Sequence, residues 1–233
     1  MGILGLHKAL SCITEERHLE DYRGQTVAVD ASSWLHKGAY GCAYQLCNNK
    51  PTTKYVDYIL DKIACLRFHG VEPHLVFDGC AIPLKRDTNA ARGSSRSENL
   101  ARGHSFRDRA RTESDAAQKQ QLWDQAHAAY QKAVRVTWEM ARAVIDALLA
   151  PAPGRPARVG YVVAPFEADA QIALLCATGK AAAAVSEDSD LLVYSVACRH
   201  YFPVLYKLDF EEATFQEVVL APMAAKTGGT DGA

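Results

Sequence analysis

The sequence predicts an α/β sandwich in which helices cover both faces of a parallel sheet. Short runs of continuous apolar residues, rather than alternating ones, are typical of strands buried on both faces. Helical stretches lie between these runs, and an alternation of strands and helices favours a parallel sheet. The length of 233 residues and the hydrophobic content of 48% suit one domain, or one domain with a large insertion.

Four apolar runs are expected to form buried strands, and a fifth run is a weaker candidate. The four runs are residues 26–30, 74–78, 159–164 and 182–186, and the weaker one is 204–208. Three helices are expected between them, at residues 55–69, 114–149 and 167–177. The first places Tyr55, Ile59 and Ile63 at helical spacing, and the second is a single long helix with an apolar stripe.

Other segments interrupt this alternation. Residues 85–111 hold eight Lys and Arg against three acids, which leaves a local charge of +5. Residues 150–158 are rich in Pro and Gly and predict a loop, and residues 221–233 predict a frayed end. We divide the chain into four regions, at residues 1–99, 100–150, 151–220 and 221–233.

The overall composition excludes several classes of protein. The apolar content is too high, and the net charge of −1 too small, for a disordered tail protein. The sequence has no apolar run of about 18 residues and no signal-peptide core at its start, so we expect a soluble intracellular protein without a membrane partner. The seven cysteines form no CxxC pair, which argues against a zinc ribbon and favours free thiols.

Acidic residues stand where the predicted strands end. They are Asp30 and Asp78 at the ends of the first two strands, Glu167 and Asp169 after the third, and Asp188 and Asp190 after the fourth. The carboxyl ends of parallel strands meet at one edge of a sheet, so these six carboxylates are expected to converge. Without a cation they would repel one another and lose hydration.

The type of ligand indicates which cation this would be. A set of carboxylate oxygens without His or Cys favours Mg²⁺ or Mn²⁺ over zinc. Spread over four strand ends, the acids could hold two ions about 4 Å apart, the arrangement for in-line phosphodiester hydrolysis. A single Asp after a strand is usually a helix N-cap or a turn residue. Four such strand ends in succession, two with acid pairs at i and i+2, favour the metal site.

The basic segment follows Asp78 by only seven residues, so it begins beside the carboxylates. Such a segment suits a polyanionic substrate, whose phosphates it would neutralise. Lys85 and Arg92, at i and i+7, would share one face of a helix. The ordinary alternative is solvated surface or a disordered linker.

Six blocks of sequence stand in order across residues 1 to about 195. They are MGILGL at 1–6, VAVDA at 27–31, WLHKGA at 34–39, LVFDGC at 75–80 with PLK at 83–85, VAPFEADAQ at 163–171 and SEDSDLL at 186–192. In order and separation these blocks resemble the N-terminal nuclease domain of the XPG-type flap-endonuclease superfamily. The WLHK stretch and the DGC ending resemble most closely its exonuclease 1 branch.

The resemblance implies a fold, an activity and a place of action. The fold is a PIN-like 5′ nuclease domain with a helical arch, at about residues 80–130, over the active site. In these terms residues 1–99 are the N-terminal nuclease region with the start of the arch, 100–150 the arch and linking helices, 151–220 the internal nuclease region and 221–233 a frayed tail. The activity is that of a metal-dependent, 5′-directed, structure-specific DNA nuclease, a 5′–3′ exonuclease or flap endonuclease. Its cofactor is two Mg²⁺ ions, for which Mn²⁺ can substitute. Its substrates are DNA 5′ ends, nicks and flaps, and it acts in DNA repair in the nucleus with repair-protein partners.

The resemblance also implies roles for single residues. The metal ligands are Asp30, Asp78, Glu167, Asp169, Asp188 and Asp190. The catalytic cations are Lys85 and Arg92, and the DNA-contacting residues are Gly2, His36, Lys37, Lys85, Arg86, Arg92 and Arg96. For His36, helix capping or core packing is the alternative role, and residues 37–46 match a helical wedge that abuts the end of a duplex.

The sequence also departs from the family pattern. A seventh carboxylate in a Gly-Cys-Asp-Tyr-type motif, a helix-two-turn-helix module that grips duplex DNA and a tail that recruits repair partners find no match here. The alternative function is therefore a truncated, catalytically weak or inactive DNA-binding fragment. Action on RNA stays open. An Asp-x-Asp phosphatase is a poor fit, because the pair Asp188 and Asp190 lies on the fourth strand and Leu191 follows it.

Overall fold

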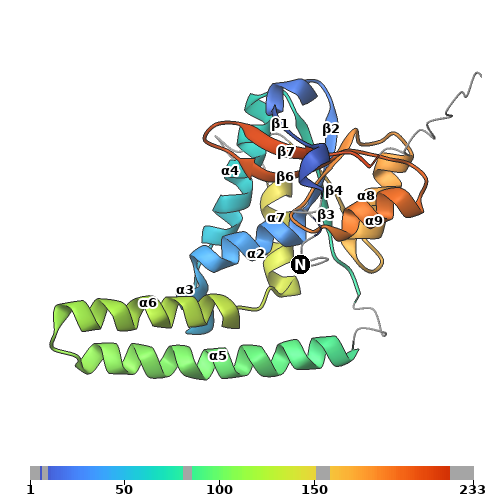
Figure 1. The fold of residues 1–233 in the computed structure, drawn as a ribbon. Helices are drawn as coiled ribbons and strands as arrows, with labels where there is room; N and C mark the ends of the chain where they lie inside the picture. Colours follow the sequence, from blue (N-terminus) through green and yellow to red (C-terminus); the bar gives the residue numbers. More distant parts are fainter. Residues whose placement is uncertain (1–5, 7–9, 81–85, 151–157, 221–233) are drawn as a thin grey trace, which may run out of the picture.

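The computed structural model describes residue 6 and residues 10–80, 86–150 and 158–220, with side chains in the basic helix described from residue 90 onward (Figure 1). Gly2, Lys85, the side chain of Arg86, most of the predicted loop at 150–158 and the predicted tail at 221–233 lie outside these residues. None of the described helices combines the length and the apolar character needed to cross a membrane.

Seven strands of the described residues form one sheet, in the order β1-β7-β6-β5-β2-β3-β4. Their bounds are β1 Thr14–His18, β2 Thr26–Asp30, β3 Glu72–Phe77, β4 Gly160–Val163, β5 Ala183–Val185, β6 Val204–Asp209 and β7 Thr214–Val218. The five predicted strands are confirmed, with bounds shifted by one or two residues. Asp78 is consequently the residue after β3 rather than its last residue.

The sheet is parallel from β6 to the edge strand β4 and antiparallel at the opposite edge. Strands β6, β5, β2, β3 and β4 run parallel to one another, whereas β7 pairs antiparallel with β6, and β1 antiparallel with β7. The predicted α/β sandwich with a parallel sheet is confirmed for these five strands, and β7 and β1 add an antiparallel edge that the sequence analysis does not include. Strand β1 has the polar sequence TEERH and is largely exposed, so it lacks the continuous apolar run by which buried parallel strands are found.

Helices cover both faces of the sheet. On one face lie α2 (Ala31–Gly41), α4 (Lys54–Phe68) and α7 (Trp138–Leu149), and on the other lie α8 (Ala168–Ala177) and α9 (Asp190–Ala197). Within β2, Val27 and Val29 belong to the first core, and Ala28 belongs to the second. This alternation makes both sides of the strand apolar, as a central strand of an α/β sandwich requires.

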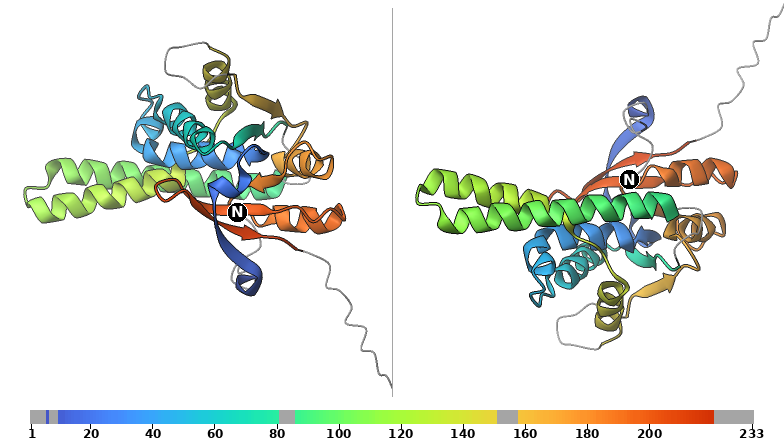
Figure 2. Two further views of the ribbon diagram at one scale, coloured as in Figure 1. Left: turned by 90° about the horizontal axis from the view of Figure 1, so that it is seen from above. Right: turned by 90° about the horizontal axis from the view of Figure 1, so that it is seen from below.

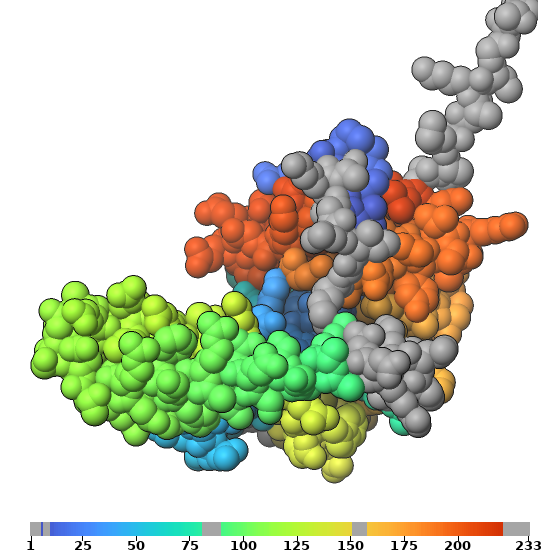
Figure 3. All heavy atoms as spheres, turned by 60° about the horizontal axis from the view of Figure 1, so that its bottom comes forward, coloured from blue at the N-terminus to red at the C-terminus, as the bar shows by residue number. Residues whose placement is uncertain are grey.

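A helical hairpin projects from this sandwich (Figures 1, 2 and 3). It consists of α5 (Arg86–Thr112) and α6 (Ala116–Ala133), and the short helix α3 (Ala43–Cys47) lies beside α6. The ring of Tyr130 packs so closely on α5 that a Cβ at Gly103 would lie 2.8 Å from it. The basic segment is thus a helix packed on a partner helix, not a linker, and it forms the predicted arch-like insertion.

The predicted single helix at 114–149 is wrong, because the chain breaks it into α6 and α7. The break falls on Val134–Thr137, where three of four residues are β-branched and Val134 has an extended ψ of 136°. Asp115 caps the start of α6 by accepting the backbone N–H of Gln118 at 2.8 Å. The break turns the chain from the hairpin back to the sandwich.

Candidate active site

Asp30 ends the central strand β2 and caps helix α2. Its Oδ1 accepts the backbone N–H of Ser33 at 3.0 Å, and its Oδ2 accepts the hydroxyl of Ser186 at 2.9 Å. The side chain is buried, and burial raises the pKa of Asp30 to about 6, with the charges of Asp78 and Asp188 acting in the same direction. Asp30 is therefore both the N-cap of α2 and a member of the acidic cluster.

Asp78 follows the neighbouring strand β3 and reaches the helix that follows β4. Its Oδ1 accepts the backbone N–H of Ala168, the first residue of α8, at 2.8 Å. Its own N–H donates to the hydroxyl of Ser32 on α2 at 3.3 Å. Glu167 and Asp169 flank Ala168 in the chain, so Asp78 is held beside both.

The close approach of two loops makes this arrangement possible. The N–H of Gly79 donates to the carbonyl of Phe166 at 2.6 Å, and the N–H of Cys80 to that of Pro165 at 3.1 Å. A Cβ at position 79 would lie 1.9 Å from the carbonyl oxygen of Ala164, so only glycine fits here. This glycine thereby places the end of β3 against the loop that carries Glu167.

Asp188 lies on the turn between β5 and α9, and Asp190 follows at the start of α9. The hydroxyl of Ser186 accepts the N–H of Asp188 at 3.0 Å, and Oδ1 of Asp188 accepts the N–H of Asp190 at 3.1 Å. Asp190 is the first residue of α9. Since β5 is the direct neighbour of β2, this turn lies beside Asp30.

The electrostatics of Asp169 show how closely the acids gather. Burial raises the pKa of Asp169 to about 7, and the next contributions come from four other acids, Asp30, Asp188, Asp78 and Glu167. The structure thus brings together acids from all four strand ends, as the sequence predicts. Asp78 is exposed, so the cluster opens to solvent at the carboxyl edge of the sheet.

The donor chemistry of this cluster fits a hard divalent cation, because the gathered donors are carboxylate oxygens. The raised pKa values of Asp30 and Asp169 reflect burial and repulsion that a bound cation would relieve. Within the described residues, no three His, Cys, Asp or Glu side chains are already arranged as ligands around one point. The elements therefore bring the acids to one edge of the sheet, but the described side chains do not form a ready-made set of metal ligands.

Cationic groups of α5 lie near the same edge. His36 on α2 is half-buried, and its pKa is lowered first by burial and then by the positive charge of Arg96, with a smaller contribution from Arg92. Asp78 acts on His36 in the opposite direction. The two arginines, one helical turn apart on α5, are therefore close enough to His36 to act on its pKa.

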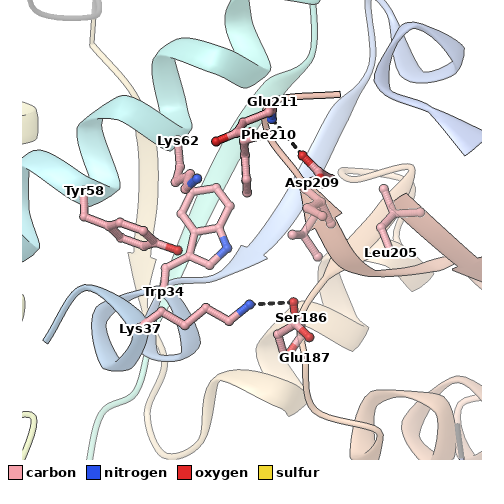
Figure 4. A pocket seen from close by; sticks show the side chains of 12 residues that line it. Trp34, Lys37, Tyr58, Lys62, Ser186, Glu187, Leu205, Asp209, Phe210 and Glu211 are labelled. Carbon is pink, nitrogen blue, oxygen red and sulfur yellow. Dashed lines mark hydrogen bonds and ion pairs between the residues drawn. The ribbon is translucent and has the colours of Figure 1, made fainter. Parts of the chain in front are cut away.

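Lys37 lies in a different environment. Its Nζ forms an ion pair with Oε1 of Glu187 at 2.7 Å (Figure 4). The same oxygen accepts the backbone N–H of Lys207 at 3.2 Å. Lys37 lines a pocket of about 370 Å³ between α2, α4 and the β6–β7 turn, where Lys62 Nζ lies 3.7 Å from the centroid of the Phe210 ring. Sequence reasoning missed Glu187, because its partner is 150 residues away.

Sequence reasoning also missed the two serines that connect the acids, Ser32 and Ser186. A signal was present, since each serine stands within two residues of an acid at a strand end. Serine in such places usually belongs to a turn or a helix cap, so position alone does not show that it bonds to an acid or to its backbone.

Two profiles of known protein families match this chain. The profile of the XPG N-terminal domain matches residues 1–99, and that of the XPG I-region matches residues 158–228. The six acids fall within these two regions. The chain belongs to the XPG family.

Among curated XPG relatives, exonuclease 1 of Oryza sativa is 38% identical over 209 residues, which are 90% of this chain and 22% of that protein. Exonuclease 1 of Xenopus laevis is 39% identical over 213 residues, 90% of this chain and 26% of the relative. Exodeoxyribonuclease 1 of Saccharomyces cerevisiae is 38% identical over 199 residues, which are 85% of this chain and 26% of that protein. The chain spans about a quarter of the length of these relatives.

Solved structures show the same fold at lower identity. The catalytic core of Rad2 in complex with DNA substrate matches with a TM-score of 0.61 and 18% identity, over 94% of this chain and 53% of that chain. Flap endonuclease-1 from Methanococcus jannaschii matches with a TM-score of 0.53 and 20% identity, over 90% of this chain and 62% of that chain. The predicted PIN-like nuclease fold is confirmed.

Proposed function

We propose that this chain is a metal-dependent, 5′-directed, structure-specific DNA nuclease that hydrolyses phosphodiester bonds. The observation that carries the proposal is the gathering of acids from four strand ends at one open edge, together with Arg92 and Arg96, which act on the same histidine, His36, as the acid Asp78. Acids and arginines together suit a phosphodiester, which needs its charge neutralised and its scissile phosphate positioned. The relatives named exonuclease 1 support this substrate class.

We infer that the cofactor is two Mg²⁺ ions, for which Mn²⁺ can substitute, held by Asp30, Asp78, Glu167, Asp169, Asp188 and Asp190. A structural neighbour, GEN1 in complex with product DNA and a Mg²⁺ ion, supports a divalent ion in this fold. Such ions supply a hydroxide nucleophile and stabilise the leaving oxygen. The protein's part is to orient the ligands, which it does through Ser186, Ser33 and the start of α8.

Other residues act on the DNA in this proposal. Arg92 and Arg96 neutralise phosphate charge at the entrance to the acids, and by the family resemblance Lys85 and Arg86 extend this basic surface. His36 contacts the DNA beside the acids, and Gly2 allows close approach to it. Lys37 can contact phosphate only by sharing or leaving Glu187, because their ion pair occupies its ammonium.

The substrates we propose are DNA 5′ ends, nicks and flaps. Rad2 solved with a DNA substrate and GEN1 solved with Holliday junction DNA, at 18% and 15% identity, support DNA as the partner of this fold. By relation to exonuclease 1 we place the chain in DNA repair in the nucleus, together with repair proteins.

The test is cleavage of a 5′-labelled duplex with a recessed 5′ end, in Mg²⁺ or in EDTA. We expect Mg²⁺-dependent release of 5′ nucleotides, lost in Asp78→Ala and retained in Asp146→Asn. Asp146 is a matched control because it is an exposed carboxylate on α7, ion-paired with Arg142 at 3.2 Å. Cleavage that survives Asp78→Ala contradicts the carboxylate mechanism.

The alternative function, a DNA-binding fragment without turnover, makes a different prediction in the same assay. It predicts salt-dependent binding of the duplex without any release of nucleotides in Mg²⁺ or Mn²⁺. A ribonucleotide version of the substrate, assayed alongside, separates DNA from RNA preference.

A further inference from the structure

Ser186 is a buried serine whose hydroxyl forms hydrogen bonds to two of the clustered acids, Asp30 and Asp188. It follows β5, it is only 3% exposed, and its hydroxyl makes two hydrogen bonds to different strand ends. It donates to Oδ2 of Asp30 at 2.9 Å and accepts the N–H of Asp188 at 3.0 Å. One buried hydroxyl therefore joins the acid that ends β2 to the turn that follows β5.

These bonds restrict both acids. Each oxygen of the Asp30 carboxylate accepts one hydrogen bond, Oδ1 from Ser33 N–H and Oδ2 from the Ser186 hydroxyl, so the plane of the carboxylate is fixed. Each oxygen retains a second lone pair for another partner. On the other side, the bond from Asp188 N–H sets the start of the turn, which continues with Oδ1 of Asp188 accepting the N–H of Asp190.

Removal of the hydroxyl would take one hydrogen bond from the buried carboxylate of Asp30 and one from the partly buried amide of Asp188. Alanine fills almost the same volume as serine, so the packing of the strand end is preserved. The carboxylate of Asp30 would gain rotational freedom, and the amide of Asp188 would seek another acceptor. The expected damage is therefore to the placing of the acids rather than to the core.

We propose that Ser186 is a positioning residue that holds Asp30 and Asp188 in the mutual arrangement needed to bind a divalent cation. This inference deepens the proposed function and rests on it. Groups that orient metal ligands in this way change metal affinity by about tenfold or more when they are lost.

The first experiment measures Mn²⁺ binding to the whole chain without DNA, by electron paramagnetic resonance of free Mn²⁺. We expect Ser186→Ala to weaken Mn²⁺ binding about tenfold and Ser186→Thr, which keeps the hydroxyl, to restore most of it. The matched control is Ser195→Ala. Ser195 is also fully buried and its hydroxyl donates to the carbonyl of Leu192 at 2.8 Å on α9, so its loss should leave Mn²⁺ binding unchanged.

The second experiment measures cleavage as a function of Mg²⁺ concentration. In Ser186→Ala the Mg²⁺ concentration for half-maximal rate should rise about tenfold, while the rate at saturating Mg²⁺ recovers to within a fewfold of wild type. A general loss of folded protein would instead lower the rate at every Mg²⁺ concentration.

The third experiment needs no metal. If Ser186 acts on Asp30, the effect of Ser186→Ala on the unfolding temperature should differ by about 2 °C or more between the wild-type chain and the Asp30→Asn variant. Equal effects in both backgrounds would show that the two side chains are not coupled.

The outcomes separate the two proposals. A wild-type chain that binds Mn²⁺ and cleaves DNA, with Ser186→Ala equal to it in both assays, overturns the role of Ser186 and leaves the nuclease standing. A wild-type chain that binds no Mn²⁺ overturns both. If Ser186→Ala does not fold, Ser186→Cys replaces it, because a thiol is a weak donor; wild-type Mn²⁺ binding by that variant counts against the inference.

Discussion

Asp78 accepts the first backbone N–H of α8, from Ala168, at 2.8 Å. An acid at the end of one strand thus caps the helix that follows the next strand, while Glu167, at the N-cap position of α8, makes no capping bond of its own. A negative charge at a helix N-terminus is favourable, so the bond stabilises the fold as well as placing the acid.

This bond leads to a prediction with two substitutions at one position. Asp78→Ala should abolish cleavage and lower the free energy of unfolding by about 1 kcal/mol, the usual cost of losing a helix cap. Asp78→Asn keeps an oxygen acceptor and should lose less stability, yet it should still abolish cleavage because the charge is gone. Urea unfolding and the nuclease assay check both. Cleavage by Asp78→Asn near the wild-type rate would show that the charge is dispensable.

The second prediction compares alanine substitutions at two glycines, Gly79 and Gly93. Gly79→Ala forces a Cβ to within 1.9 Å of a backbone oxygen, so the two loops must separate. We expect a loss of stability of about 2 kcal/mol or more, with loss of activity. Gly93→Ala on α5 is the control: no atom lies within 4 Å of the added Cβ, and this helical site should gain up to about 1 kcal/mol. Thermal unfolding and cleavage assays distinguish them; equal effects would argue against the close approach.

The third prediction concerns pH and metal. The pKa values of Asp30 and Asp169 are raised to about 6 and about 7, so between about pH 4 and pH 7 the folded chain binds more protons than the unfolded chain. The contribution of these groups to stability is therefore present at low pH and lost as the pH rises through 6 to 7. Mg²⁺ should raise the unfolding temperature clearly at pH 8 and little at pH 5.5, where protons neutralise the acids. Asp169→Asn should flatten this dependence in thermal scans of the metal-free chain, and an unchanged slope would refute the assignment.

The fourth prediction concerns the basic helix. Arg92→Ala and Arg96→Ala should each weaken binding of duplex DNA and reduce the slope of log K against log salt by about 1. Arg142→Ala on α7 is the control, because this exposed arginine pairs with Asp146 and lies on another element. Fluorescence anisotropy at several salt concentrations gives the slopes. Identical slopes for all three variants would remove α5 from the DNA interface.

The central strands and their acids could be predicted because each signal is local. The runs at β2, β3, β4 and β5 are mainly apolar, and each acid stands within a few residues of a run. The parallel arrangement then brings the acids together without further information, since it fixes which ends of the strands meet.

The remaining features depend on distant partners. Strands β1 and β7 are partly polar and gain their place by pairing with each other across 200 residues. The pair of Lys37 and Glu187, and the bond of Ser186 to Asp30, also span more than 140 residues. The break between α6 and α7 has a local signal, the β-branched residues at 134–137. The apolar stripe continues across these residues, however, and so predicts one helix instead of two.

The position of β2 has a consequence for the order in which the chain is made. Its partner β3 follows within about fifty residues, but its other partner, β5, comes some 150 residues later. During synthesis on the ribosome, β2 therefore carries an open, apolar edge until residue 185 has emerged, and such an edge invites pairing with other chains. The six acids are complete only after Asp190, which follows the end of β5 by five residues, so they can gather only once β2 has both of its neighbouring strands.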